Sequence, residues 1–188
     1  MASRSFKGYL MVLLQDAEEL IQAHAKLRTG QRGRQWKLGA LNRAVVLMCV
    51  SAWEAYVEEL AKEALESFRP TMGALPQWQS LNAACRSQIG RFNTPNSQNV
   101  RLLIADAIGL QNVTDSWHWQ NCTVVDARRH LDEVLDFRHK IAHGVNPRPT
   151  VHNQWVAKLP EFFRNLGRCT DKAVRQYLRT KLGVKKPW

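Results

Sequence analysis

The stretch from Ala44 to Trp53 limits most strongly how this chain can fold, because apart from Ser51 it is apolar on every side of a helix. It forms the first half of a longer helical segment, about Leu38 to Phe68, whose second half becomes amphipathic. A helix that is apolar all round has to be covered by other elements on all sides. We therefore expect this segment to lie in the middle of a helical bundle.

Other segments also favour helices. About Ser5 to Arg28 carries leucines at helical spacing with acidic residues between them, which predicts an amphipathic helix. A short helix is expected from Asn99 to Ile108, closed by Gly109. Between them, Leu75 to Asn99 is rich in polar residues without a sustained period, and we expect short helices and loops there.

Two further helices are predicted in the C-terminal half. Thr123 or Asp126 is expected to cap a helix that runs to about Ala142. A last helical region follows Thr150, and Pro160 should kink or restart it. Because no segment alternates as a strand does, the predicted fold class is all-α, a bundle with additional short helices. We expect one domain over residues 1–188, with a short basic tail from about residue 182.

The charge balance favours a polyanionic partner. The chain has 27 lysines and arginines against 16 acidic residues, a formal net charge of +11. RNA or another nucleic acid leads the list of partners and an anionic membrane surface follows, although a merely soluble basic surface has the same composition. No apolar run reaches the roughly 18 to 20 residues of a membrane span, and the four cysteines show no paired spacing. These features predict a cytoplasmic protein with reduced thiols and no membrane association.

The helix predicted from Asp126 carries an unusual arginine. Arg138 falls on the apolar stripe of this helix, three residues after Leu135. A guanidinium stays charged, so at such a position it needs a carboxylate, a partner subunit or a phosphate to offset its lost hydration. His143 stands at the end of the same helix, just before Gly144, where an imidazole can remain accessible.

This pair suits cleavage of RNA without a metal, because the 2′-hydroxyl of the substrate is the nucleophile. Histidine can transfer protons near neutral pH, and arginine can bind the phosphate as negative charge develops. An ion-paired arginine beside a helix-ending histidine is the simpler structural interpretation of the same residues.

The segment from Phe137 to Gly144 resembles the HEPN motif, in which an arginine, a polar residue and three further residues precede a histidine that closes a helix. The polar residue is usually Asn or Asp, and here it is His139. The segments Ser51 to Leu60 and Arg91 to Asn96 are similar to parts of the RiboL-PSP and MAE-type HEPN subfamilies. The resemblance covers about Leu10 to Leu178.

The resemblance implies a bacterial or phage-conflict ribonuclease, often a toxin or defence effector, which works as a homodimer with two facing motifs. By this analogy Arg138 binds the scissile phosphate, His143 is the general acid or base, and His139 orients its neighbours or supports the second proton transfer. It implies no cofactor. An antitoxin or regulatory protein is a further expected partner.

Other constellations leave alternatives open. Glu54 is either a carboxylate partner for Arg138 or a residue facing solvent. His139 and His143 have zinc-ligand spacing, but Lys140 stands where a catalytic glutamate would be and no third ligand is evident, so we expect no metal site. Trp117, His118 and Trp119 either stack on bases or fill core and dimer contacts. The basic side of the last helix is either an RNA track or a solvated face; it includes Arg164, Arg168, Lys172 and Arg175.

The leading hypothesis is therefore a metal-independent endoribonuclease. A non-catalytic module that binds RNA or a protein partner is the alternative, because many HEPN domains bind RNA without cutting it. A structural dimerisation domain is a third hypothesis.

Overall fold

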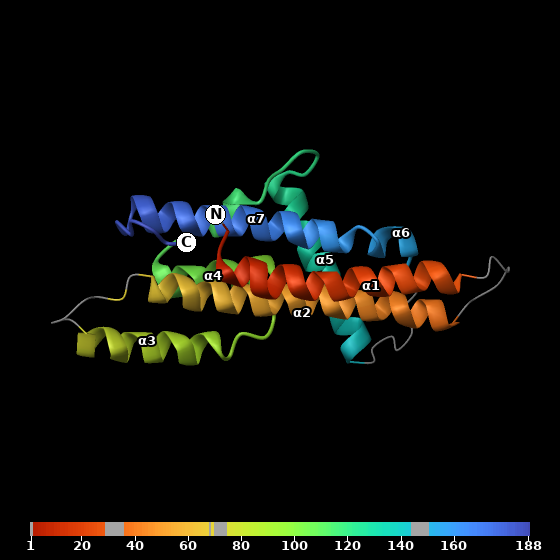
Figure 1. The fold of residues 1–188 in the computed structure, drawn as a ribbon, viewed down its shortest axis with the longest axis horizontal. Helices are drawn as coiled ribbons and strands as arrows, with labels where there is room; N and C mark the ends of the chain where they lie inside the picture. The colour runs from red at the N-terminus through yellow and green to blue at the C-terminus, as the bar shows by residue number, and fades with distance from the viewer. Residues whose placement is uncertain (1, 29–35, 68, 70–74, 144–150) are drawn as a thin grey trace.

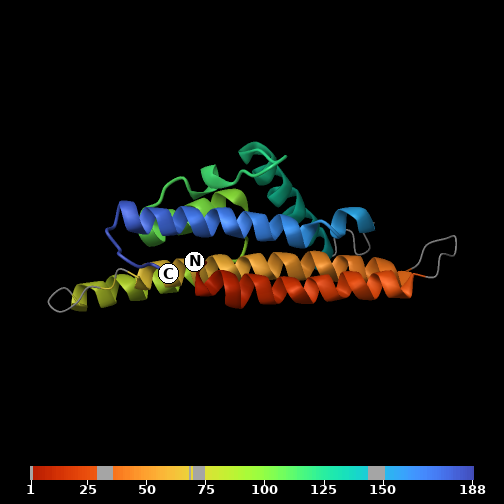
Figure 2. The same ribbon diagram turned by 45° about the horizontal axis from the view of Figure 1, so that its top comes forward.

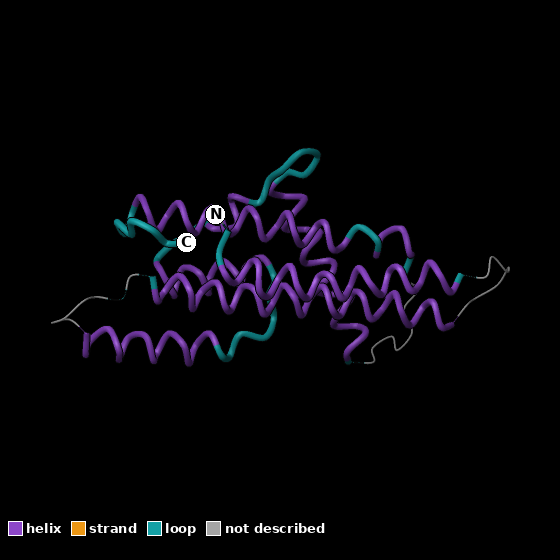
Figure 3. Tube along the Cα trace, in the orientation of Figure 1, coloured by secondary structure: helices purple, strands orange, loops and turns teal. Residues whose placement is uncertain are grey.

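The computed structural model describes residues 2–28, 36–67, 69, 75–143 and 151–188. Within these ranges the backbone forms helices and connecting loops, with one isolated β-bridge (Figure 3). In chain order the elements are a π-helix η1 (Phe6–Leu10), α1 (Met11–Leu27), α2 (Trp36–Glu66), α3 (Leu75–Ile89), α4 (Ser97–Ile108), a 3₁₀ helix η2 (Val113–Ser116), α5 (Val124–Ala142), α6 (Asn153–Val156) and α7 (Leu159–Thr180). The all-α prediction is confirmed for the described residues.

Helix α2 is the central element, as its all-round apolar half predicts. It pairs along its length with α1 and also contacts α3, α4, α5, α6 and α7 (Figures 1 and 2). Trp53 and Tyr56 of α2 are fully buried and stack against each other with ring centroids 5.6 Å apart. The Trp53 indole donates to the carbonyl of Pro95 at 3.0 Å, so its one polar group is satisfied inside the core.

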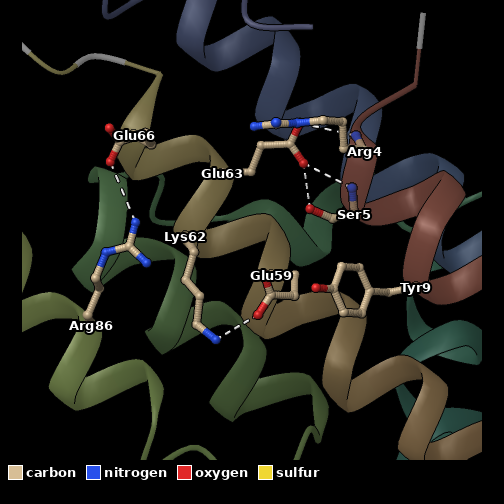
Figure 4. A pocket seen from close by; sticks show the side chains of 8 residues that line it. All are labelled: Arg4, Ser5, Tyr9, Glu59, Lys62, Glu63, Glu66 and Arg86. Carbon is tan, nitrogen blue, oxygen red and sulfur yellow. Dashed lines mark hydrogen bonds and ion pairs between the residues drawn. The ribbon is translucent and has the colours of Figure 1, made fainter.

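The N-terminus is fastened to α2 by one carboxylate. Glu63 accepts hydrogen bonds from the backbone N–H groups of Arg4 and Ser5 and from the Ser5 hydroxyl. Figure 4 shows these bonds beside a cavity whose other charged groups also pair with one another, such as Lys62 with Glu59. Negative charge is favourable at the exposed N–H groups that begin a helix, which explains why η1 starts here.

Helix α5 crosses the α1–α2 pair steeply, and its C-terminal end emerges beyond the edge of α2 (Figure 1). Thr123 is its N-cap, because the hydroxyl accepts from the Asp126 N–H at 3.2 Å. Asp132 reaches from α5 to the first turn of α4 and accepts from both the N–H and the hydroxyl of Ser97. The cap sets where α5 begins, and the bonds to Ser97 hold the middle of α5 against α4.

Helix α7 begins where Pro160 restarts the chain, in the first turn where a missing N–H costs nothing. It packs against α1, α2, η1 and η2. Buried Asp171 of α7 accepts from the Ser3 N–H at 3.0 Å and from the Trp188 indole at 3.2 Å. The two ends of the described chain therefore meet on α7.

The stretch predicted as short helices and loops is different in the structure, where α3 is a continuous 15-residue helix. Only Trp78, Cys85 and Ile89 of its 15 residues are buried. So few buried positions leave no sustained hydrophobic period in the sequence. The predicted helix from Asn99 begins slightly earlier, with Asn96 as N-cap and Gly109 in the left-handed conformation at its end. The expected cap at Thr150 lies outside the described residues.

In the parts of the chain that are described, no helix combines the length and the hydrophobicity needed to cross a bilayer. The four cysteines are free thiols. Burial raises the pKa of Cys49 to about 12, so this thiol behaves as a small apolar side chain.

Candidate functional site

Arg138 lies on the side of α5 that packs against the bundle. Leu131, Val134 and Leu135 of this side are buried, whereas Arg138, one turn further on, is only partly exposed. Neighbouring Phe137 packs on Trp155 of α6 with ring centroids 5.6 Å apart. The guanidinium is therefore partly desolvated, as the position of the arginine in the apolar stripe predicts.

Glu54 of α2 lies near enough to Arg138 for the two charges to interact. Burial raises the pKa of Glu54, and the positive charge of Arg138 opposes that rise. No hydrogen bond or ion pair within 4.0 Å joins Arg138 to another residue that the structure describes. Arg138 thus has an acidic neighbour, while its N–H groups are not taken up by a described partner.

Other acidic residues of α5 have partners elsewhere. Asp132 accepts hydrogen bonds from Ser97 in the first turn of α4, as described above, and Asp136 forms an ion pair with Lys140 one turn along the same helix. These carboxylates would compete with a phosphate for Arg138 if they were directed toward it. Their observed contacts leave Glu54 as the carboxylate that acts on Arg138.

Two imidazoles stand together at the end of α5. His143 is the C-cap, and its backbone N–H donates to the carbonyl of His139 at 3.0 Å. The two rings lie one turn apart with centroids separated by 4.4 Å, and both residues are exposed. A substrate can therefore reach either ring.

Arg138 and His143 leave the helix in different directions. Five residues correspond to about 140° of rotation at 3.6 residues per turn. Arg138 points toward the bundle side and His143 toward solvent at the end of the helix. Within one chain the two side chains therefore lie on different sides of the end of α5.

The predicted basic track on α7 is divided. Arg164 forms an ion pair with Glu18 of α1, whereas Arg168 and Lys172 are exposed. Lys172, Arg175 and Arg179 line a surface cavity of about 360 Å³. The part of this track that is most open to an anion is therefore the second half of α7.

Comparison with protein families gives a match over residues 13–176 to the family RiboL-PSP-HEPN. The chain belongs to the RiboL-PSP-HEPN family. The matched region includes α2, the whole of α5 and most of α7, and it confirms the resemblance seen in the sequence around Arg138 and His143. The comparison with curated proteins and the comparison with solved structures found no match.

HEPN membership indicates a ribonuclease or another RNA-related function. The Arg-x4-His segment of this HEPN domain lies at the exposed end of α5, where the geometry allows access to a large substrate. The roles of Arg138, His139, His143 and Glu54 stay predictions.

The two tryptophans of the connection before α5 lie in different environments. Trp117 is fully buried, donates to the Thr170 hydroxyl at 2.9 Å and packs on Trp53, so it is a core residue. Trp119 is partly exposed and borders a cavity of about 760 Å³. No local pattern in the sequence indicates this cavity, because Trp119 and Phe162, which line it, lie 43 positions apart.

Proposed function

We propose that this HEPN domain is a metal-independent endoribonuclease. The observation that carries the proposal is the accessible end of α5, where the exposed rings of His139 and His143 lie together, within five residues of a partly desolvated Arg138 that faces another side of the helix. Family membership and the net charge of +11 support RNA as the substrate. A role as a toxin or phage-defence effector, restrained by an antitoxin or regulatory protein, is the biological setting that fits this activity.

The reaction needs proton transfer and charge stabilisation. The 2′-hydroxyl oxygen of RNA attacks the adjacent phosphorus while a base removes its proton. The bond from phosphorus to the 5′-oxygen then breaks, and an acid protonates the leaving oxygen. The products are a 2′,3′-cyclic phosphate and a 5′-hydroxyl.

Each residue of the α5 end has a role in this scheme. Arg138 binds the non-bridging oxygens of the phosphate, where its fixed fork of donors matches the developing charge. His143 is the general acid or base, and His139 supports the second proton transfer or orients His143. Glu54 holds the guanidinium in place without forming the close ion pair that would block it.

A homodimer is part of the proposal. Arg138 and His143 diverge by about 140° around one helix, so a second copy packed against the α5 end would enclose the phosphate from the other side. Light scattering coupled to size exclusion should then give twice the 21.6 kDa mass of one chain. A monomer that retains full nuclease activity would contradict this part of the proposal.

The activity is tested with purified protein and RNA in the presence of a chelator. Wild type should cleave. His143→Ala should lose about 100-fold or more in rate, the scale of a lost general acid or base, and Arg138→Ala should lose about as much, the scale of a lost donor to the developing charge. Arg129→Ala on exposed α5 and His152→Ala before α6 are matched controls that should cleave normally. Cleavage that persists in both site variants would remove the assigned site. RNA binding without cleavage by wild type would favour the non-catalytic module.

A further inference from the structure

The connection before α5 forms a tight hairpin that borders a cavity of about 760 Å³. Trp119 and Cys122 exchange backbone hydrogen bonds of 3.1 and 3.0 Å, with Gln120 and Asn121 between them. Asn121 has φ of 63°, a left-handed conformation that asparagine tolerates better than most residues. The closed turn fixes the position of Trp119 at the edge of the cavity.

Three aromatic rings form the apolar wall of this cavity. Trp119 lies 5.9 Å from Phe162 of α7, and Phe162 lies 4.5 Å from His130 of α5 in an edge-to-face arrangement. All three residues are only partly exposed. Burial lowers the pKa of His130, so its imidazole is largely neutral at physiological pH and adds an uncharged ring to the wall.

The rest of the lining is polar and includes three amides. Gln120 and Asn121 come from the hairpin, Asn165 from α7, and Lys158 and Glu161 stand at the start of α7. The side-chain amide oxygen of Asn165 (Oδ1) accepts a hydrogen bond from the Arg168 guanidinium at 3.3 Å. For four of these side chains no partner is found among the described residues: Gln120, Asn121, Lys158 and Glu161.

A cavity lined by aromatic rings and by amide side chains matches the chemistry of a nucleobase. Unpaired bases bind proteins by stacking on aromatic rings and by hydrogen bonds from their polar edges, for which Asn and Gln supply both donors and acceptors. The cavity volume of about 760 Å³ falls in the range of small-ligand sites and is more than one base requires.

We propose that this cavity binds an unpaired nucleobase, which stacks on Trp119, contacts Phe162 and is hydrogen-bonded by the amides of Gln120, Asn121 and Asn165. The identification of RNA as the source of the base rests on the proposed function. Lys158, at the rim, is the cation for the adjoining phosphate.

The position of the cavity relative to the α5 end agrees with a single RNA strand that touches both. His130 precedes Arg138 by eight residues, about 12 Å along the helix axis. A stacked strand covers that distance with about three to four nucleotides. The cavity would thus hold a base a few positions from the cleaved bond and contribute to sequence preference there.

Binding of a 2′-O-methyl oligonucleotide tests the proposal, because this probe cannot be cleaved through its 2′-oxygen. Fluorescence anisotropy compares a probe with bases and the same backbone with abasic residues. Wild type should bind the probe with bases about tenfold more tightly, the scale of one base stacked on an aromatic side chain. In Trp119→Leu, Gln120→Ala and Asn165→Ala this ratio should fall toward one.

Trp155→Leu is the matched control, since Trp155 is also partly exposed and contacts His130 but does not line the cavity. Its ratio should stay near the wild-type value. Gln120→Ala removes an exposed side chain, so it keeps the test decisive if Trp119→Leu fails to fold.

Failure of this inference differs from failure of the proposed function. Equal binding of both probes by wild type would overturn the base pocket and leave the nuclease proposal standing. No binding of either probe would count against RNA as the substrate, and titration with nucleoside monophosphates then decides the pocket. Saturable binding of a monophosphate that is lost in Trp119→Leu would support a free nucleotide as the source of the base, and its absence would overturn the pocket.

Discussion

Among the single residues of the site, Glu54 has the clearest electrostatic signature. Its pKa is raised because burial disfavours the charged carboxylate more than Arg138 favours it. A carboxyl with a raised pKa in the folded state contributes stability at low pH, and that contribution is lost as the pH rises through the folded-state pKa.

Glu54→Gln should therefore become more stable relative to wild type as the pH rises from below 4 to about 7. Urea unfolding at a series of pH values measures the difference. Glu19→Gln, which changes an exposed carboxylate on α1, is the control for the substitution itself. A difference that shrinks as the pH rises would mean that the pairing with Arg138 outweighs the cost of burial.

Asn121 gives a prediction about local backbone strain. At φ of 63°, a β-branched side chain clashes with its own backbone, so Asn121→Val should lower the free energy of unfolding by about 1–2 kcal/mol. Asn121→Gly should be nearly neutral, because glycine adopts this conformation freely. Equal stability of the valine and glycine variants in urea would contradict the left-handed turn.

The sequence predicts some residues well and others poorly, for physical reasons. The partial burial of Arg138 follows from its place in the stripe with Leu135, because helical spacing alone sets which side a residue faces. The different fates of Trp117 and Trp119 do not follow from sequence. They depend on a turn at Asn121 and on contacts with Thr170 and Phe162, which are distant in the chain.

At the level of elements, Gly167 lets α7 lie close against the N-terminal helices. A Cβ atom added at Gly167 would stand 2.2 Å from Leu10 and 3.1 Å from the ring of Phe6. Leu10 is fully buried, so its side chain has little room to move. The Gly167 carbonyl also accepts from the Tyr56 hydroxyl at 3.0 Å, which holds α7 on α2.

Gly167→Ala should destabilise the protein by about 1–2 kcal/mol, because overpacking outweighs the higher helix propensity of alanine. Gly8→Ala is the matched control, since an added Cβ there meets no atom within 4 Å. In thermal unfolding, Gly167→Ala should have a lower unfolding temperature than both Gly8→Ala and wild type. A Gly167→Ala variant more stable than wild type would show that the helices can move apart at little cost.

The sequence predicts the boundaries of some helices better than those of others. Helices α2 and α5 were predicted within a few residues, because each has a dense apolar pattern or a clear cap such as Thr123. Helix α3 was missed because it buries few residues and makes fewer contacts with the bundle. The π-helical start of the chain depends on Glu63, nearly sixty residues away, and no local pattern indicates it.

For the whole molecule, the excess of positive charge predicts salt-dependent RNA binding. If Arg168 and Lys172 each contact one phosphate, Arg168→Gln with Lys172→Gln should weaken binding of all RNA sequences alike and reduce the slope of log K against log salt by about 1.4. Lys7→Gln with Lys26→Gln, two exposed cations near α1, has the same charge change. Equal effects of the two pairs would mean that net charge, and not the α7 face, governs binding.

The central claim is that RNA is cut through its own 2′-hydroxyl at the end of α5. Mass spectrometry of the products from a defined oligoribonucleotide, in chelator, tests it directly. The account predicts 2′,3′-cyclic phosphate and 5′-hydroxyl ends, and no cut at a position where the preceding ribose is 2′-deoxy. Products with 5′-phosphate ends, or cleavage of the 2′-deoxy position at the normal rate, would contradict it.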